Sequence, residues 1–353
     1  MRSLRPRPRP APPSPLATAV AAWGLPGAPP IPDTPLSAIE FGEFAAECDA
    51  HRIVGLAALA ADAGDLPLSP EQIRQFAERV RGWFASELRH EELAVRAVTL
   101  LDAAGIQSRV LKGVANAHLC YPQPEMRTFG DIDLLVQPGH FHRAAVLLAE
   151  LLPAVRIAAE PHEGFDDEFG REILLRRGGE ELDLHRTFVD GYYGLCVPVG
   201  ELFDGGNGFV LGDREVTALP ASARLVHACL SAAVADAQPR LAACRDIVQL
   251  MTMTDADEAV AVAERWKCTG PLAAGVLAAT QLLPAPDLPL VRWAHQHPPR
   301  ITTRTLIAIY RSGWRGPLGL ASGLLAPLGV RGRVRYLRGI VRQSWVSWRS
   351  RPG

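Results

Sequence analysis

Apolar residues at helical spacing dominate residues 36–104. The clearest helix opens at Ser69, an N-cap residue, with Pro70 at the first helical position and Gln72 at the capping-box position. Gly105 is typical of a helix end. The apolar stripe of this predicted helix consists of Ile73, Phe76, Ala77, Val80, Phe84 and Leu88.

After Gly105, the helical pattern is replaced by short runs in which apolar and polar residues alternate. Gly178 and Gly179 stand between two such runs and predict the two-residue turn of a β-hairpin. We expect strands at residues 108–111, 131–136, 172–177 and 180–188, a brief helix at 115–119 and a helix at 138–152. A helical pattern returns at residues 222–235, 240–253, 255–266 and 271–283. The pattern therefore predicts an α+β fold, in which N-terminal and C-terminal helical regions flank a small mixed β-sheet.

The predicted elements divide the chain into five segments. The first 35 residues are rich in Arg and Pro, which suit neither a helix nor a sheet, so we expect a disordered tail there. The remaining segments are an N-terminal helical region at 36–104, an α/β core at 105–195, a C-terminal helical region at 196–330 and a basic amphipathic helix at 331–353.

The composition indicates a protein of a reducing compartment. The 353 residues are 48% hydrophobic and 21% charged, and their formal net charge of −1 gives no argument for nucleic-acid binding. Six cysteines are scattered without a C-x-x-C pair, so we expect no zinc site, no disulfide framework and a cytoplasmic location. No apolar stretch reaches the roughly 18 residues of a membrane-spanning helix.

Two carboxylates stand one residue apart in the apolar run that ends at Val136. In a strand, Asp131 and Asp133 would point to the same face, while Ile132 would point into the core. Neighbouring carboxylates repel each other unless a cation lies between them, and Mg²⁺ prefers such oxygen ligands. An alternative is that Asp131 caps a turn after Gly130, which would leave only Asp133 in the strand.

A third carboxylate lies in the second strand of the predicted hairpin. Leu182 and Leu184 face one way in this strand, and Asp183 and His185 face the other. If the strands pair in one sheet, the three acids converge as two-metal catalysis requires. The alternative is an ordinary solvent-facing side. Because Mg²⁺ prefers oxygen, His185 suits a role in shaping the site better than a role as metal ligand.

Cationic and small residues precede these acids. Lys occurs only twice in the chain, at Lys112 and Lys267. Lys112 lies in the segment from Val110 to Val136, which also contains Asp131 and Asp133. Gly113 follows a predicted strand and precedes a predicted helix, where backbone N–H groups can approach a phosphate. Lys112 and Arg127 are the candidate cations for a triphosphate.

These motifs together resemble the uncharacterised subgroup of the polymerase-β-like nucleotidyltransferases. The resemblance rests on L-K-G at 111–113, Y-P at 121–122, R-T-F-G-D-I-D-L-L-V at 127–136 and E-L-D-L-H at 181–185, and it covers roughly residues 90–255. It implies a nucleotidyltransferase core at 105–195, metal binding and catalysis by Asp131, Asp133 and Asp183, Mg²⁺ or Mn²⁺, and a nucleoside triphosphate (NTP). It also implies nucleotide contacts from Lys112, Gly113, Arg127 and His185.

The chain departs from the broad superfamily beside the predicted phosphate site. The usual Gly-Ser pair is Gly113-Val114 here, so a hydroxyl is missing and Lys112 would take its place. Our leading hypothesis is transfer of a nucleoside monophosphate (NMP) to a hydroxyl of a small molecule, peptide or protein. The rivals are a D-x-D glycosyltransferase that uses a nucleotide sugar, and a degenerate domain that binds nucleotide without turnover.

The C-terminal segment combines arginines with apolar residues at helical spacing. Its predicted apolar face consists of Val334, Leu337, Val341, Trp345 and Trp348. One interpretation is a surface that contacts nucleic acid or another anionic surface. The other is a terminal helix that docks on the protein through this aromatic stripe.

Overall fold

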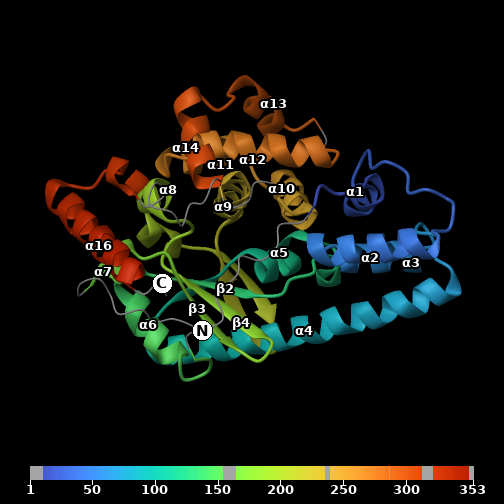
Figure 1. Cartoon of the computed structure of the whole chain (residues 1–353), viewed down its shortest axis with the longest axis horizontal. Helices are drawn as coiled ribbons and strands as arrows, with labels where there is room; N and C mark the ends of the chain where they lie inside the picture. The colour runs from blue at the N-terminus through green and yellow to red at the C-terminus, as the bar shows by residue number, and fades with distance from the viewer. Residues whose placement is uncertain (1–10, 154–163, 235–238, 286, 312–320, 350–353) are drawn as a thin grey trace.

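A six-stranded mixed sheet forms the centre of the protein, as a computed structural model shows for residues 11–153, 164–234, 239–285, 287–311 and 321–349 (Figure 1). The strand order is β3-β4-β2-β1-β6-β5. The central β2 runs parallel to β4 and antiparallel to β1, which in turn runs parallel to β6. The strands are β1 (Ser108–Val110), β2 (Ile132–Val136), β3 (Glu172–Arg177), β4 (Glu180–His185), β5 (Asn207–Leu211) and β6 (Arg214–Ala218). The α+β fold with a mixed sheet is thereby confirmed.

Two hairpins supply the outer strands of the sheet. The β3-β4 hairpin turns at Gly178, whose φ of 62° favours glycine, in agreement with the sequence-based prediction. The β5-β6 hairpin was not expected, because residues 196–220 are Gly-rich and indicated a loop before the helices of the C-terminal region. Its strands alternate exposed and buried residues around Gly212, which has a φ of 61°. This period-2 pattern was hidden by the glycines that surround it.

One face of the sheet is covered by α4 (Pro70–Ala103) and α6 (Phe141–Leu148), which run along the bottom of the view in Figure 1. Ser69 and Gln72 form the predicted capping box of α4. The predicted apolar stripe of α4 is wrong in part, because Ile73, Phe84 and Leu88 are about half exposed. The sheet-facing side uses the second half of the helix instead, with Leu93, Ala94, Ala97, Val98 and Leu101 buried against the strands.

The opposite face of the sheet adjoins a large helical core. Leu135 of β2 belongs to that core, whereas its neighbours in the strand pack toward α4. The helix α9 (Ala221–Val234) is buried on nearly every side, and α10 (Leu241–Met253) and α12 (Thr269–Leu282) pack against it. The surrounding helices are α11 (Ala256–Arg265), α13 (Pro289–Gln296) and α14 (Ile301–Arg311).

Residues 11–35, which were expected to belong to a disordered tail, contain a buried helix, so that expectation is corrected for this part of the segment. Ser14 caps α1 (Pro15–Ala22), and Ala17 and Val20 are fully buried. The apolar run after Ser14 therefore outweighs the Pro-rich composition around it, because it can cover the helices behind it. Residues 1–10 lie outside the described residues. The neighbouring helices are α2 (Ala38–His51) and α3 (Val54–Asp62).

The remaining elements connect these layers and close the fold. They are the helices α5 (Lys112–Cys120), α7 (Phe165–Phe169), α8 (Gly191–Cys196) and α16 (Val330–Arg349), and the short 3₁₀ helices η1 (Pro124–Met126), η2 (Pro138–His140), η3 (Val199–Phe203) and η4 (Ser322–Leu325). Within the described part of the chain, every helix is too short or too polar to cross a lipid bilayer.

Candidate active site

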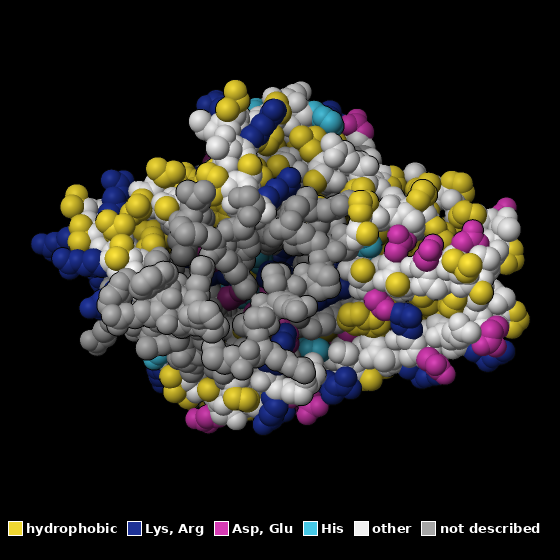
Figure 2. Space-filling view, in the orientation of Figure 1, with side chains coloured by type: hydrophobic (Ala, Val, Ile, Leu, Met, Phe, Trp, Pro, Cys, Tyr) yellow, Lys and Arg dark blue, Asp and Glu magenta, His cyan; other side chains and the backbone are white. Residues whose placement is uncertain are grey.

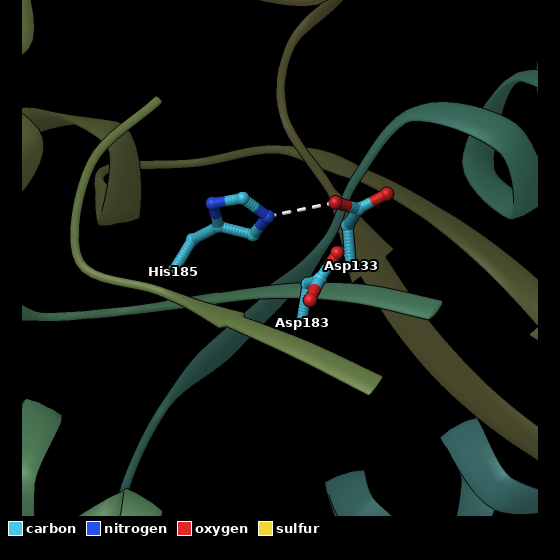
Figure 3. A group of neighbouring side chains, drawn as sticks. All are labelled: Asp133, Asp183 and His185. Carbon is cyan, nitrogen blue, oxygen red and sulfur yellow. Dashed lines mark hydrogen bonds and ion pairs between the residues drawn. The ribbon is translucent and has the colours of Figure 1, made fainter. Parts of the chain in front are cut away.

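Neighbouring parallel strands bring two of the predicted carboxylates together. Asp133 of β2 and Asp183 of β4 occupy paired positions in the register, so their side chains leave the sheet on the same face. Figure 3 shows both carboxylates on this face, with the ring of His185 beside them. Asp131 directly precedes β2, which places the start of the strand one residue later than predicted. The pairing of β2 with β4 thus brings acids from separate parts of the sequence into one cluster.

Two overlapping groups of ligand atoms arise from this arrangement. One atom each from Asp133, Asp183 and His185 lies within 4.8 Å of the others, and the same holds for Asp131, Glu181 and Asp183. Asp183 belongs to both groups and lies at their junction. Among the described residues, the three predicted acids therefore form two adjoining sites, to which Glu181 adds a carboxylate that the sequence did not single out.

The inner carboxylate is held by two nitrogen donors. Lys112 Nζ lies 2.6 Å from Asp133 Oδ1, and His185 Nε2 lies 2.7 Å from the same oxygen. Lys112 is the first residue of α5, where its φ of 48° is in the left-handed region that non-glycine residues seldom adopt. A non-glycine residue in this conformation costs energy and is typical of a functional site. The backbone here thus directs the ammonium toward the acids.

The two paired carboxylates have opposite electrostatic environments. Burial raises the pKa of Asp133, but the Lys112 ammonium and the His185 hydrogen bond outweigh it and hold this pKa below its usual range. Burial, followed by the Asp133 carboxylate, raises the pKa of Asp183 above its usual range. Lys112 and His185 therefore compensate the charge of Asp133, whereas Asp183 has too little positive charge around it. A divalent cation next to Asp183 would favour its ionised form.

Two histidines border the acids in their neutral form. Burial and then Lys112 lower the pKa of His185, and they lower the pKa of His227 in the same order. Because the Asp133 carboxylate only accepts hydrogen bonds, the proton of His185 is assigned to Nε2. His227 of α9 stacks on Phe188, and its buried Nε2 has no hydrogen-bond partner among the described residues. From its position in an apolar helix, His227 was interpreted as a core histidine and not as a residue of the site.

Arg52 is a further residue of the site that the sequence did not indicate. Its guanidinium lies 2.9 Å from Asp131 Oδ1 and 3.3 Å from Asp131 Oδ2, a two-point contact with the carboxylate. Arg52 ends α2 with a φ of 56°, a position where glycine is common. The left-handed conformation of Arg52 is visible only in the structure, and nothing in the sequence joins this arginine to a residue so distant along the chain.

The loop that leads to Asp131 is clamped by the N-terminal helices. The backbone N–H of Gly55 donates to the Thr128 hydroxyl over 3.1 Å, and a Cβ on Gly55 would overlap the carbonyl of Glu125. Gly130 lies against the Trp83 ring, where an added Cβ would be 3.2 Å from the indole. These close approaches fix the position of the loop and therefore of the Asp131 carboxylate.

We expect Gly55→Ala to destabilise the protein by about 1–3 kcal/mol, because the new methyl group must displace the backbone at Glu125. Gly42→Ala is the matched control, since Gly42 lies in α2 with nothing within 4 Å of an added Cβ. That control is expected to stabilise by about 0.5–1 kcal/mol. Urea unfolding followed by circular dichroism measures both, and equal effects would contradict the clamp.

A half-buried carboxyl on α4 predicts a pH-dependent stability. The N–H of Phe129 donates to Glu87 Oε1 over 3.2 Å, and burial raises the pKa of Glu87 to about 8. The folded protein therefore retains a proton that the unfolded chain loses above its ordinary pKa near 4.5. This contribution to stability is present in full below pH 4.5 and is lost as the pH rises toward 8.

Glu87→Gln keeps an oxygen for Phe129 and removes the titration. Between about pH 5 and 8, we expect the free energy of unfolding of the wild type to fall relative to that of the variant by up to about 1.4 kcal/mol per pH unit, and its melting temperature to fall with it. Glu78→Gln, on an exposed position of the same helix, serves as the control. Parallel melting curves for the wild type and Glu87→Gln would show that Glu87 titrates normally.

Two of the predicted nucleotide contacts already have structural partners. Arg127 is buried, and its Nε and Nη2 each lie 2.8 Å from a carboxylate oxygen of Asp246. Gly113 packs against Phe129, where an added Cβ would lie 2.7 Å from the Phe129 Cβ. The geometry thus gives Arg127 and Gly113 structural roles, and their contacts with a nucleotide stay predictions. Lys112 and His185, in contrast, directly contact Asp133.

Comparisons with known proteins identify the family of the chain. A similar solved structure is the antigenic nucleotidyltransferase-like protein from Paracoccidioides brasiliensis, with 18% identity and a TM-score of 0.35 over 60% of this chain and 95% of that one. No curated protein matches the chain. The family model described as "Uncharacterised nucleotidyltransferase" matches residues 37–284. Because this match spans well over half of the sequence, the chain belongs to the uncharacterised nucleotidyltransferase family.

Proposed function

We propose that the protein is a Mg²⁺-dependent nucleotidyltransferase that moves an NMP from an NTP to a hydroxyl group and releases pyrophosphate. The acceptor would be a small molecule, a peptide or a protein. The observation that carries the proposal is the register of β2 with β4, which sets Asp133 beside Asp183 with Asp131 one residue before the strand. Three carboxylates on one face of a sheet are the arrangement that metal-assisted phosphoryl chemistry uses.

The donor set fits Mg²⁺, with Mn²⁺ as an alternative. Asp131, Asp133, Asp183 and Glu181 offer carboxylate oxygens, and hard divalent cations prefer such ligands. Asp183 belongs to both ligand groups, and its raised pKa supports the proposal that a cation binds beside it. When bound, the metal would neutralise charge on the phosphate oxygens and lower the pKa of the attacking hydroxyl.

The start of α5 suits the triphosphate. Leu111, the N-cap of α5, makes no side-chain hydrogen bond to the helix, so first-turn N–H groups have no side-chain cap. The Lys112 ammonium lies at the same helix end and contacts Asp133. We infer that Lys112 supplies the charge for a phosphate in place of the hydroxyl that Val114 lacks. His185 would hold the Asp133 carboxylate in orientation while the substrate binds.

A cytoplasmic setting belongs to the same proposal. All six cysteines are free, and five of them are buried. Free buried thiols are typical of proteins that fold in a reducing compartment. A cytoplasmic location would also supply NTP and Mg²⁺ to the site.

The direct test is transfer of label from α-³²P-labelled ATP, GTP, CTP and UTP with Mg²⁺ or Mn²⁺, with a cell lysate as the source of acceptors. Wild type is compared with the Asp131→Ala/Asp133→Ala double variant, and with Asp213→Asn, which changes an exposed acid in the β5-β6 turn. Label transfer and pyrophosphate release that vanish only in the double variant would support the proposal. Mass spectrometry of the labelled product would then identify the acceptor.

Two other outcomes would favour the rival functions. Turnover of a nucleotide sugar, with no turnover of any NTP, would favour a glycosyltransferase. Metal-dependent NTP binding without turnover, across all lysates tested, would favour a degenerate nucleotide-binding domain. Neither binding nor transfer by the folded wild type would contradict the proposed function.

A further inference from the structure

The charges of this chain are strongly separated along its length. The 66 residues after Asp287 contain twelve Arg and no Asp, Glu or Lys. Because the whole chain has a formal net charge of −1, the first 287 residues carry −13. Such asymmetry within one chain is typical of a segment that meets an anionic partner.

The helix α16 lies at the edge of the molecule and docks through one face. Tyr336 and Ile340 are buried against Phe165 and Phe169 of α7. Gly339 lies so close to Phe165 that a Cβ there would overlap the ring. Arg335 pairs with Glu168 over 2.9 Å beside this contact. The helix is therefore fixed on the body of the protein by a defined face.

The solvent-facing side of α16 is apolar. This corrects the interpretation in which the predicted apolar stripe docks on the protein. Val330, Val334, Leu337 and Val341 follow each other at helical spacing and are 81%, 44%, 48% and 59% exposed. The predicted stripe of Val334, Leu337 and Val341 thus faces solvent, and the side chains of Trp345 and Trp348 lie outside the described residues. Figure 2 shows hydrophobic and basic side chains together where α16 lies, at the left of the view.

Exposed arginines border this apolar stripe. With 3.6 residues per turn, Arg331 and Arg338 fall on one flank of the stripe and Arg333 falls on the other. All three side chains are exposed. An apolar stripe between two basic flanks is the pattern of a helix that lies flat in a membrane interface.

We propose that α16 binds the surface of a membrane that contains anionic lipids. The stripe from Val330 to Val341 would enter the boundary between headgroups and acyl chains, and the flanking arginines would contact anionic headgroups. A nucleic acid would satisfy the arginines but leave the apolar stripe in water. The lipid interface is the partner that matches both the charge and the apolar surface. This proposal does not depend on the transferase chemistry.

Sedimentation with vesicles tests the proposal on the full chain. The probes are phosphatidylcholine vesicles with and without phosphatidylglycerol, at low and high salt. We expect binding only to the anionic vesicles, and weaker binding at high salt because arginine–headgroup attraction is screened. No binding to anionic vesicles, or equal binding to both kinds, would overturn the proposal.

Two variants separate the apolar and basic contributions. Val334→Ser/Leu337→Ser is expected to weaken vesicle binding about tenfold, and Arg331→Gln/Arg333→Gln/Arg338→Gln about 100-fold. The matched controls are Val210→Ser on the exposed side of β5 and Arg81→Gln on α4, which should bind as the wild type does. Melting temperatures confirm that each variant is folded.

A polyanion distinguishes lipid from nucleic acid. The same variants are titrated with transfer RNA at low salt. If RNA binds as tightly as anionic vesicles, and Val334→Ser/Leu337→Ser leaves both affinities unchanged, the apolar stripe has no part in binding and the proposal fails. If that variant loses vesicle binding alone, the lipid surface is supported as the partner.

Discussion

Asp133→Asn is expected to lower the rate of nucleotidyl transfer by about 10³-fold, the largest effect of any single substitution that we predict for activity. Asp133 pairs with Asp183 across β2 and β4 and accepts hydrogen bonds from Lys112 and His185. The amide keeps the shape of the side chain but removes its negative charge. Initial rates of pyrophosphate release at saturating NTP and Mg²⁺ measure the loss.

A second readout separates metal binding from turnover. Ligands that bind only the folded state stabilise it, by about 2.7 kcal/mol at one hundred times the dissociation constant. Mg²⁺ or Mn²⁺ should therefore raise the melting temperature of the wild type, and this increase should be lost in Asp133→Asn. The control Asp213→Asn should behave as the wild type in both assays. Full activity of Asp133→Asn, with its metal-dependent stabilisation intact, would exclude Asp133 from the site.

The sequence was sufficient for the central part of the candidate site. Alternation of polar and apolar residues in two strands is enough to place Asp133 and Asp183 on one face of each strand. What the sequence lacked was the register between the strands, which depends on the whole sheet. That register brings the Asp183 carboxylate into one group of potential ligands with Asp133 and His185, whereas Asp131 belongs to the second group.

Residues that reach the site through contacts between distant parts of the chain could not be predicted from the sequence. Arg52 contacts Asp131 from 79 positions away, and no periodic pattern connects a helix end to a strand so distant. His227 shows a related difficulty, because an apolar helix with one histidine predicts a core position whether or not a site lies beside it. Such residues become visible only when the packing of the helices around the sheet is known.

Hydrophobic patterns predicted which helices and strands exist more reliably than they predicted which face of each one is buried. The helix at α4 was predicted with its capping box, yet half-exposed Ile73 and Leu88 were assigned to the buried stripe. Periodicity defines a stripe, but the position of the sheet decides which half of a long helix is covered. The same reasoning applies to α16, where the docking face consists of Tyr336 and Ile340.

Asp246→Ala is expected to destabilise the protein by about 3–5 kcal/mol, the largest effect on stability that we predict. Asp246 of α10 accepts two hydrogen bonds from Arg127 and one of 2.7 Å from the Tyr121 hydroxyl. All three side chains are buried. Burial lowers the pKa of Arg127, but Asp246 outweighs it and holds this pKa above its usual range. Loss of the carboxylate would therefore leave a guanidinium charge buried without a counter-ion.

Urea unfolding of Asp246→Ala beside a variant that lacks both charges shows how much of this cost comes from the uncompensated charge. Arg127→Met/Asp246→Leu should be less destabilised than Asp246→Ala, because the double variant removes the charge together with its partner. The control is Asp102→Ala, which breaks a more exposed ion pair with Arg214 and should cost at most about 1 kcal/mol. If Asp246→Ala costs no more than this control, the pair does not hold the C-terminal helices to the loop before β2. If it costs the full amount, the loop that carries Asp131 depends on α10 for its position.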